Sequence, residues 1–198
     1  MPIRWRDDDG VTLIEMVVGM TVMMIFLGIF TGSMILMSRS ETKARAVSDT
    51  STQVNQAFLW LDKNVRYSSG ISTPGTSSGD FYVELSNTGT GSQVCTQVRL
   101  HVTNHQLQRR SWTVSGSSYT NLTAWLPVAD NITNSTTPFS VASTVTGSEV
   151  HQQLGVNLTS VGGSANAPTT SESAFTLTAV NSASADAQSG LCQEVARP

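Results

Sequence analysis

The apolar residues of the chain follow three successive patterns, and the first is an unbroken run. From Met16 to Ser38 no side chain is ionisable, and the residues are Met, Val, Ile, Leu, Phe, Gly, Thr and Ser. At ~1.5 Å per residue a helix of this length is roughly 34 Å long, enough to span a bilayer core of about 30 Å. The run therefore predicts a transmembrane helix near the start of the chain.

The second pattern is a helical stripe of apolar residues that follows this run. The residues recur at steps of seven, four, three and four, and two neighbours widen the stripe. They are Val47, Val54, Phe58, Leu61 and Val65, with Ala57 and Trp60 beside them. We expect one long helix that continues to about Ser69, where Gly70 and a glycine- and serine-rich stretch stop it. Such a stripe indicates packing under a domain rather than a recognition surface.

The third pattern, beyond Gly79, is an alternation of apolar and polar residues with a period of two, which is typical of strands. Clusters of Gly, Ser, Asn and Pro separate the alternating segments. The segments read FYVELS, QVCTQVRLHV, HQLQRRSWTV, AWLPV, FSVAS, LGVNLTSV and AFTLTAV. They predict a mostly antiparallel sheet and a loop-rich C-terminal tail. The expected fold class is α+β, with a long N-terminal helix packed on an antiparallel β-sheet head.

Composition and charge indicate the compartment and the partners of the protein. The chain has 198 residues, which suits one domain with an anchor, and a net charge of -3. Charged residues make up 13% of it, below the roughly 25% typical of soluble domains. Ser, Thr, Asn and Gly crowd the second half, as is common in exported proteins. No basic patch is present, so we expect no direct nucleic-acid binding.

The two cysteines, Cys95 and Cys192, agree with export. They lie far apart, with no C-x-x-C motif and no nearby pair of histidines, so a zinc or thioredoxin-like site has little support. A single disulfide in an oxidising compartment is favoured, with two free thiols as the alternative. A disulfide would tie the C-terminal tail to the strand that carries Cys95 and stabilise the fold by about 4 kcal/mol on the chain-entropy model.

The charges that flank the apolar run leave its orientation ambiguous, because Arg4 and Arg6 precede it while Arg39, Lys43 and Arg45 follow it. Large domains translocate largely regardless of local charge, so the composition of the C-terminal part predicts a head on the extracytoplasmic side. A cleaved secretory signal peptide would have a shorter apolar core and a cleavage site after it. We therefore expect the run to remain as a membrane anchor.

One carboxylate, Glu15, lies at the beginning of this apolar segment. A lone carboxylate in lipid costs at least ~2.5 kcal/mol on insertion scales, so Glu15 either reaches the headgroup level or needs a partner. The surrounding block is a short polar leader that ends in Gly10, then VTLIE, then the apolar helix. This block resembles the type IV pilin and pseudopilin signature. The resemblance implies that a prepilin peptidase cleaves between Gly10 and Val11 and methylates the new amine of Val11.

The same resemblance implies how the subunit assembles. The Glu15 carboxylate of one subunit would neutralise the terminal amine of a neighbour in a filament, so that one contact offsets two buried charges. Gly28 and Gly32 form a G-x-x-x-G spacing, which lets helices approach closely or permits local loss of helix, although ordinary glycines of a membrane helix fit equally well. The chain differs from the usual family pattern in having Val11 instead of Phe and an acidic leader.

The pilin resemblance divides the chain into four parts. These are a leader peptide (1–10), a transmembrane and filament-core helix (11–38), an amphipathic continuation (39–69) and a β-rich head (70–198). The stretch AFLWLDKNVRYSSGIS also resembles the helix end of the larger J-type or PilW-like minor pilins.

The resemblance implies a structural subunit of a type IV pilus or a related secretion or DNA-uptake pseudopilus. The large, loop-rich head favours a minor subunit over the major one. The implied partners are other pilin or pseudopilin subunits, the prepilin peptidase and an inner-membrane assembly platform. The subunit would be a single-pass membrane protein before assembly and then part of a cell-surface or periplasmic filament. The alternative is a permanently anchored extracellular binding module.

No motif in the remaining sequence indicates an enzyme, so we expect no catalytic residue, cofactor or metal ion. His101 and His105 flank a predicted turn without an acid or cysteine at ligand spacing, which favours exposed hairpin histidines. Trp112, Trp125 and Tyr119 could form an exposed binding patch, but core or sheet packing is the favoured interpretation.

Overall fold

The computed structural model describes residues 12–88, 91–115, 118–146, 149–164, 167–182 and 191–192. The chain divides into two compact units, Met1–Ala44 and Arg45–Pro198, and each is described by itself. Gly10 and Val11, and the predicted tail at 183–190 and 193–198, lie outside the described residues.

The first element, α1 (Leu13–Arg66), is a helix of 54 residues. In its first part, which lies in the first unit, large apolar side chains are exposed all around the helix, for example Met24 at 70% and Phe30 at 60%. Among the described residues, α1 is the one helix that is long and apolar enough to cross a membrane. An apolar surface on every side of a helix requires surroundings other than water.

The helix ends at Arg66, three residues before the predicted end. The main-chain N–H and the hydroxyl of Ser68 both donate hydrogen bonds to the carbonyl oxygen of Val65, at 3.0 and 2.7 Å. The N–H of Ser69 donates to the carbonyl oxygen of Ser86 at 2.7 Å, so the chain has already joined the sheet. Serine side chains compete with the helical hydrogen bonds of the backbone, which explains the earlier stop.

The buried face of α1 in the second unit differs in part from the predicted stripe. Val47 is 44% exposed, so its predicted place in the stripe is wrong. The buried residues recur at steps of four, four, three, four and four. They are Ala46, Thr50, Val54, Ala57, Leu61 and Val65. Val47 lies about 100° around the helix from Ala46, which turns its side chain away from this line.

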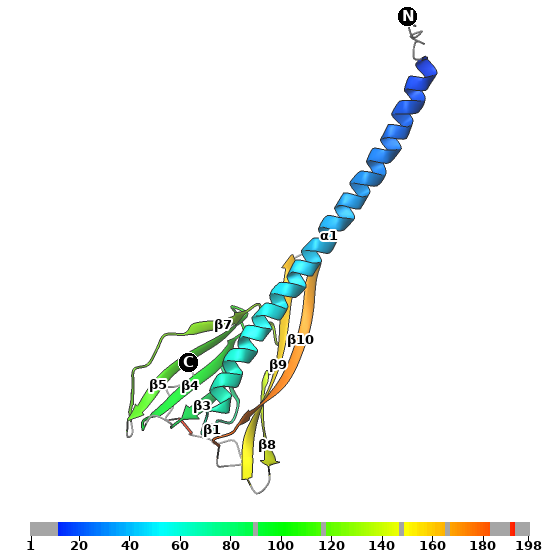
Figure 1. The fold of residues 1–198 in the computed structure, drawn as a ribbon. Coiled ribbons are helices and arrows are strands. Elements are labelled where there is room, and N and C mark those ends of the chain that lie inside the picture. Colours follow the sequence, from blue (N-terminus) through cyan, green and yellow to red (C-terminus); the bar gives the residue numbers. More distant parts are fainter. Residues whose placement is uncertain are drawn as a thin grey trace, which may run out of the picture. The chain divides into compact units, whose positions relative to one another are not determined.

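Two antiparallel sheets form the rest of the second unit (Figure 1). The strands of the larger sheet are β1 (Gly70–Ile71), β2 (Gly75–Ser77), β3 (Asp80–Asn87), β4 (Gln93–His101), β5 (Gln106–Ser115), β6 (Ser118–Thr120) and β7 (Leu126–Asp130). Its order is β1-β3-β4-β5-β6, with β2 paired to β3 and β7 paired to β5. The smaller sheet has the order β10-β9-β8. Its strands are β8 (Phe139–Thr146), β9 (Glu149–Ser164) and β10 (Ala167–Ala179).

The predicted α+β class, with a long helix on antiparallel sheets, is confirmed. Each alternating segment of the sequence overlaps one of the strands β3, β4, β5, β7, β8, β9 and β10. The short edge strands β1, β2 and β6 were not predicted, because two or three residues are too few to show an alternation. All the strand pairings are antiparallel.

The hydrophobic core lies between α1 and the sheets. It contains buried residues from the helix, from β3, β4 and β5 of the larger sheet, and from β9 and β10 of the smaller one. They include Ala57, Leu61, Val65, Val83, Leu85, Val98, Leu100, Leu107, Leu154, Val156, Leu158 and Leu177. Since side chains alternate along a strand, the remaining side chains of β3, β4 and β5 point to the opposite face of the larger sheet.

Candidate functional site

The first turn of α1 carries the charged residue that interrupts the apolar segment. The N–H of Glu15 donates to the carbonyl oxygen of Thr12 at 3.0 Å and to its hydroxyl oxygen at 3.4 Å. Thr12 therefore caps the helix, which begins at Leu13. A carboxylate at the third helical position is favoured by the helix dipole and by the Thr-x-x-Glu spacing of a capping box.

Thr12 was missed by the sequence reasoning, although the Thr-x-x-Glu spacing could have identified it. The Glu15 side chain is exposed, and no described residue of its own chain forms an ion pair with it. A buried environment, whether lipid or protein, would therefore have to supply a cation for this carboxylate.

Gly28 and Gly32 lie one turn apart on α1. A Cβ atom built on either glycine would meet no other atom within 4 Å. The pair therefore forms a bare strip of helix backbone that a neighbouring helix could approach.

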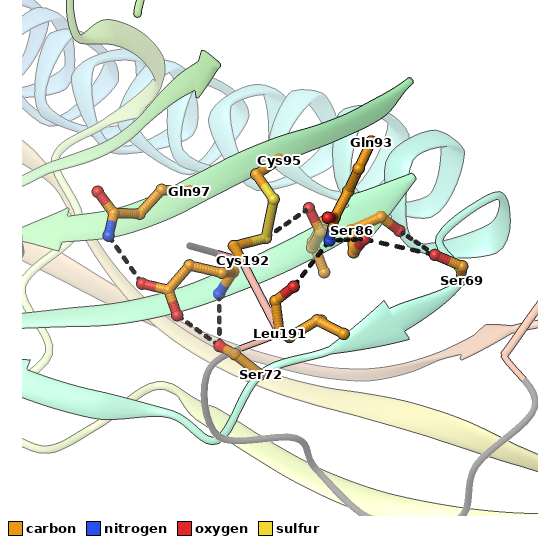
Figure 2. The surroundings of a disulfide bond; sticks show 10 residues. Ser69, Ser72, Ser86, Gln93, Cys95, Gln97, Leu191 and Cys192 are labelled. Carbon is orange, nitrogen blue, oxygen red and sulfur yellow. Dashed lines mark hydrogen bonds between the residues drawn. A yellow bond between two sulfur atoms is a disulfide. The ribbon is translucent and has the colours of Figure 1, made fainter. Parts of the chain in front are cut away.

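The structure joins Cys95 of β4 to Cys192 by a disulfide across 97 positions of sequence, which confirms the predicted pairing. Figure 2 shows the hydrogen bonds beside it. The side-chain amide of Gln93 donates to the carbonyl oxygen of Leu191 at 2.7 Å and to the hydroxyl of Ser86 at 2.9 Å. The disulfide packs against the buried ring of Trp112.

The side chain of Leu191 packs against Gly70, the first residue after the turn that ends α1. A Cβ atom at Gly70 would lie 2.8 Å from one methyl carbon of Leu191, so a side chain there would displace the leucine. Leu191 and Cys192 are thus held to the larger sheet by a covalent bond, a hydrogen bond and an apolar contact.

A row of polar side chains crosses the face of the larger sheet opposite the core. Glu84, Gln97 and Arg110 are direct neighbours in the register of β3, β4 and β5. The amide of Gln97 donates to Glu84 at 2.7 Å, and the Nε of Arg110 donates to the amide oxygen of Gln97 at 2.8 Å. The hydroxyl of Ser72 also donates to Glu84. All four side chains are buried, so the row satisfies polar groups that water cannot reach.

Burial lowers the pKa of Arg110 below its ordinary value, and the neighbouring Arg99 lowers this pKa further. Tyr82 and Glu84 act in the opposite direction. Both guanidinium groups also lie near the ring of Trp125, at 4.0 Å for Arg99 and 4.5 Å for Arg110. The ring thus provides favourable cation–π contacts for two neighbouring cations.

The prediction that three aromatic side chains pack in the core or on the sheet is confirmed for two of them. Trp112 is 1% exposed, and Trp125 is half-buried beside the two arginines. Tyr119 is 46% exposed and does not join the core.

The two histidines of the β4–β5 turn differ from each other. His105 is exposed, as predicted, and has a positive φ of 54°. His101 is half-buried, and its Nδ1 atom lies 2.9 Å from a carboxylate oxygen of Asp80, so the prediction of an exposed His101 is wrong. Asp80 is 21 positions earlier in the chain and reaches His101 only through the pairing of β3 with β4. Within the described part of the chain, no group of three or more His, Cys, Asp or Glu side chains could hold a metal ion.

The comparison with protein families identifies the N-terminal segment. Residues 5–31 match the family model described as the prokaryotic N-terminal methylation motif. This motif is the signature of type IV pilins and pseudopilins, and the predicted resemblance is confirmed at that level. The matched segment leads into α1, whose packing on antiparallel sheets is a pilin-like architecture. No curated protein and no solved structure significantly matches the chain.

Proposed function

We propose that this chain is a structural subunit of a type IV pilus or of a related secretion or DNA-uptake pseudopilus. The observation that carries the proposal is the methylation motif at residues 5–31, which continues into a helix with exposed apolar side chains. The motif points to a structural subunit rather than an enzyme. It also fits a membrane-anchored precursor that assembles with other pilin subunits.

The first step of the proposal is processing. A prepilin peptidase removes residues 1–10 by cleaving between Gly10 and Val11, and the amine of Val11 is methylated. The mature chain then begins with an ammonium group four residues before Glu15. Before assembly, residues 11–38 anchor the subunit in the membrane, and the head (70–198) lies on the extracytoplasmic side.

The second step is docking through the helix. In the filament, Glu15 of one subunit pairs with the terminal ammonium of the next, because each charge would be costly to bury alone. The bare strip at Gly28 and Gly32 allows close helix contact or local loss of helix. An inner-membrane platform would move the helix out of lipid into the filament. The segment 39–69 links this core helix to the head.

We further propose a minor subunit, of the J-type or PilW-like group, rather than the major one. The support is the head, whose described residues form ten strands, and the long hairpin of β9 and β10. The exposed Glu15 argues for a subunit that docks against a neighbour.

Affinity purification of the crosslinked membrane form tests the assignment. The proposal expects co-purified small proteins that carry the same methylation motif. Recovery of the chain alone, from cells that assemble pili or pseudopili, would favour a permanently anchored extracellular binding module instead.

A further inference from the structure

The end of β9 approaches the backbone of α1 at a single glycine. A Cβ atom at Gly162 would lie 2.7 Å from the carbonyl oxygen of Ala46 and 2.7 Å from the methyl carbon of Thr50. Both distances are far below ordinary contact, and one of the two atoms belongs to the backbone, so only glycine fits without a shift of the strand or the helix. Ala46 and Thr50 are 5% and 2% exposed, respectively, even though they lie at the very beginning of the second unit. Figure 1 shows the β9–β10 hairpin running beside α1.

Other contacts that the described residues make between α1 and the head lie further along the helix. The amide oxygen of Gln53 accepts a hydrogen bond from the N–H of Asp130 at 3.0 Å. The ring of Phe58 meets that of Phe175 edge to face, with centroids 5.2 Å apart. Gln53 lies about 10 Å further along the helix than Ala46, so the contact at Gly162 extends the interface of the head toward the beginning of α1.

The contact at Gly162 lies outside the main apolar cluster of the core. Its helix side consists of two small side chains, whereas the contacts further along involve Phe58, Leu61 and Val65. A contact that buries little apolar surface can open without unfolding of the core, because local stability follows the number of buried apolar contacts.

From these observations we propose that the Gly162 end of β9 is a latch on α1. In the closed state the head supports the helix from Ala46. In the open state the strand end separates from Ala46 and Thr50, and residues 46–52 lose their support while the core stays intact. The latch thus sets how much of the helix the head holds. The inference rests on contacts within the second unit and does not depend on the proposed function.

Hydrogen exchange on the full chain in detergent micelles tests the latch. The variant Gly162→Val forces the strand away from the helix but suits a strand, since Gly162 lacks a left-handed backbone. Thr50→Leu forces the same separation from the helix side. The matched control is Val161→Thr, because position 161 points to the other face of β9.

We expect the amides of residues 46–52 to exchange at least about tenfold faster in Gly162→Val and in Thr50→Leu than in the wild type. Exchange in residues 57–65 and in β3, β4 and β5 should stay unchanged, and Val161→Thr should match the wild type throughout. Two results would overturn the latch. One is unchanged exchange at 46–52 in both variants, and the other is an equal loss of protection through α1 and the larger sheet.

Discussion

The N–H of Glu15 lies 3.4 Å from the hydroxyl oxygen of Thr12, so the residue that interrupts the apolar segment also belongs to the cap of α1. Two features of the helix N-terminus favour Glu15 at this position. The cap keeps Glu15 in the first turn, and the dipole of the helix favours a carboxylate there. The proposed function assigns the carboxylate itself to a partner on another subunit.

The first prediction concerns Glu15→Ala. Membrane insertion should be unchanged or slightly improved, because a carboxylate is removed from an apolar helix. Incorporation into filaments should fall strongly, because the terminal ammonium of the neighbour loses its counter-ion. Immunoblots of membrane and sheared-filament fractions would measure both quantities. Glu41→Ala is the matched control, since Glu41 lies on α1 beyond the apolar run; equal incorporation of the two variants would refute the role of Glu15.

A second prediction concerns the disulfide. Cys95→Ser with Cys192→Ser should lower the free energy of unfolding by about 2–5 kcal/mol, as is usual for the loss of a native disulfide. Denaturant titration of the full chain in detergent, followed by tryptophan fluorescence, would measure this change. Trp112 packs on the disulfide, so its emission should also change when the bond is reduced. A loss below ~1 kcal/mol would mean that the bond contributes little to the fold.

The third prediction compares two leucines on α1. Leu61 is fully buried in the core, and Leu61→Ala should cost about 2–5 kcal/mol of unfolding free energy through lost burial and a cavity. Leu59 is 60% exposed two residues earlier, and Leu59→Ala should stay within about 0.5 kcal/mol of the wild type. The same denaturant titration distinguishes them. Similar losses for both variants would contradict the assigned helix face.

A fourth prediction concerns the polar row of the larger sheet. Gln97→Leu removes a hydrogen-bond donor to Glu84 and a hydrogen-bond acceptor for Arg110, so each of two buried ionisable groups loses one partner. We expect a loss of roughly 2–3 kcal/mol of unfolding free energy. Thr96→Val, at the next position and on the other face of β4, serves as the control and should change the stability little. A stable Gln97→Leu variant would show that the row does not support the fold.

The sequence alone was sufficient to predict the features that appear in it as a periodic pattern or as a local motif. The apolar run, the alternation in β3 to β5 and β7 to β10, the pair of cysteines and the block from Gly10 to Glu15 are local patterns, and each has a direct physical meaning. The helix face was predicted correctly where large residues such as Leu61 and Val65 mark it. It was wrong at Val47, because the true line continues through the small residues Ala46 and Thr50.

The remaining features depend on which strands pair and in what register. The contact of His101 with Asp80 and the row from Glu84 to Arg110 arise only when β3, β4 and β5 lie side by side. The close approach of Gly162 to α1 requires the full length of the β9–β10 hairpin. No pattern within a single segment could have predicted these contacts.

The central claim is that the chain is processed as a pilin-type precursor, and the mass of its N-terminal peptide tests that claim most directly. The chain should be purified from cells with an active prepilin peptidase and analysed by mass spectrometry. We predict a mature N-terminus at Val11 with a methylated amine and no trace of residues 1–10. A chain that retains Met1 and the leader in these cells, without methylation, would contradict the account.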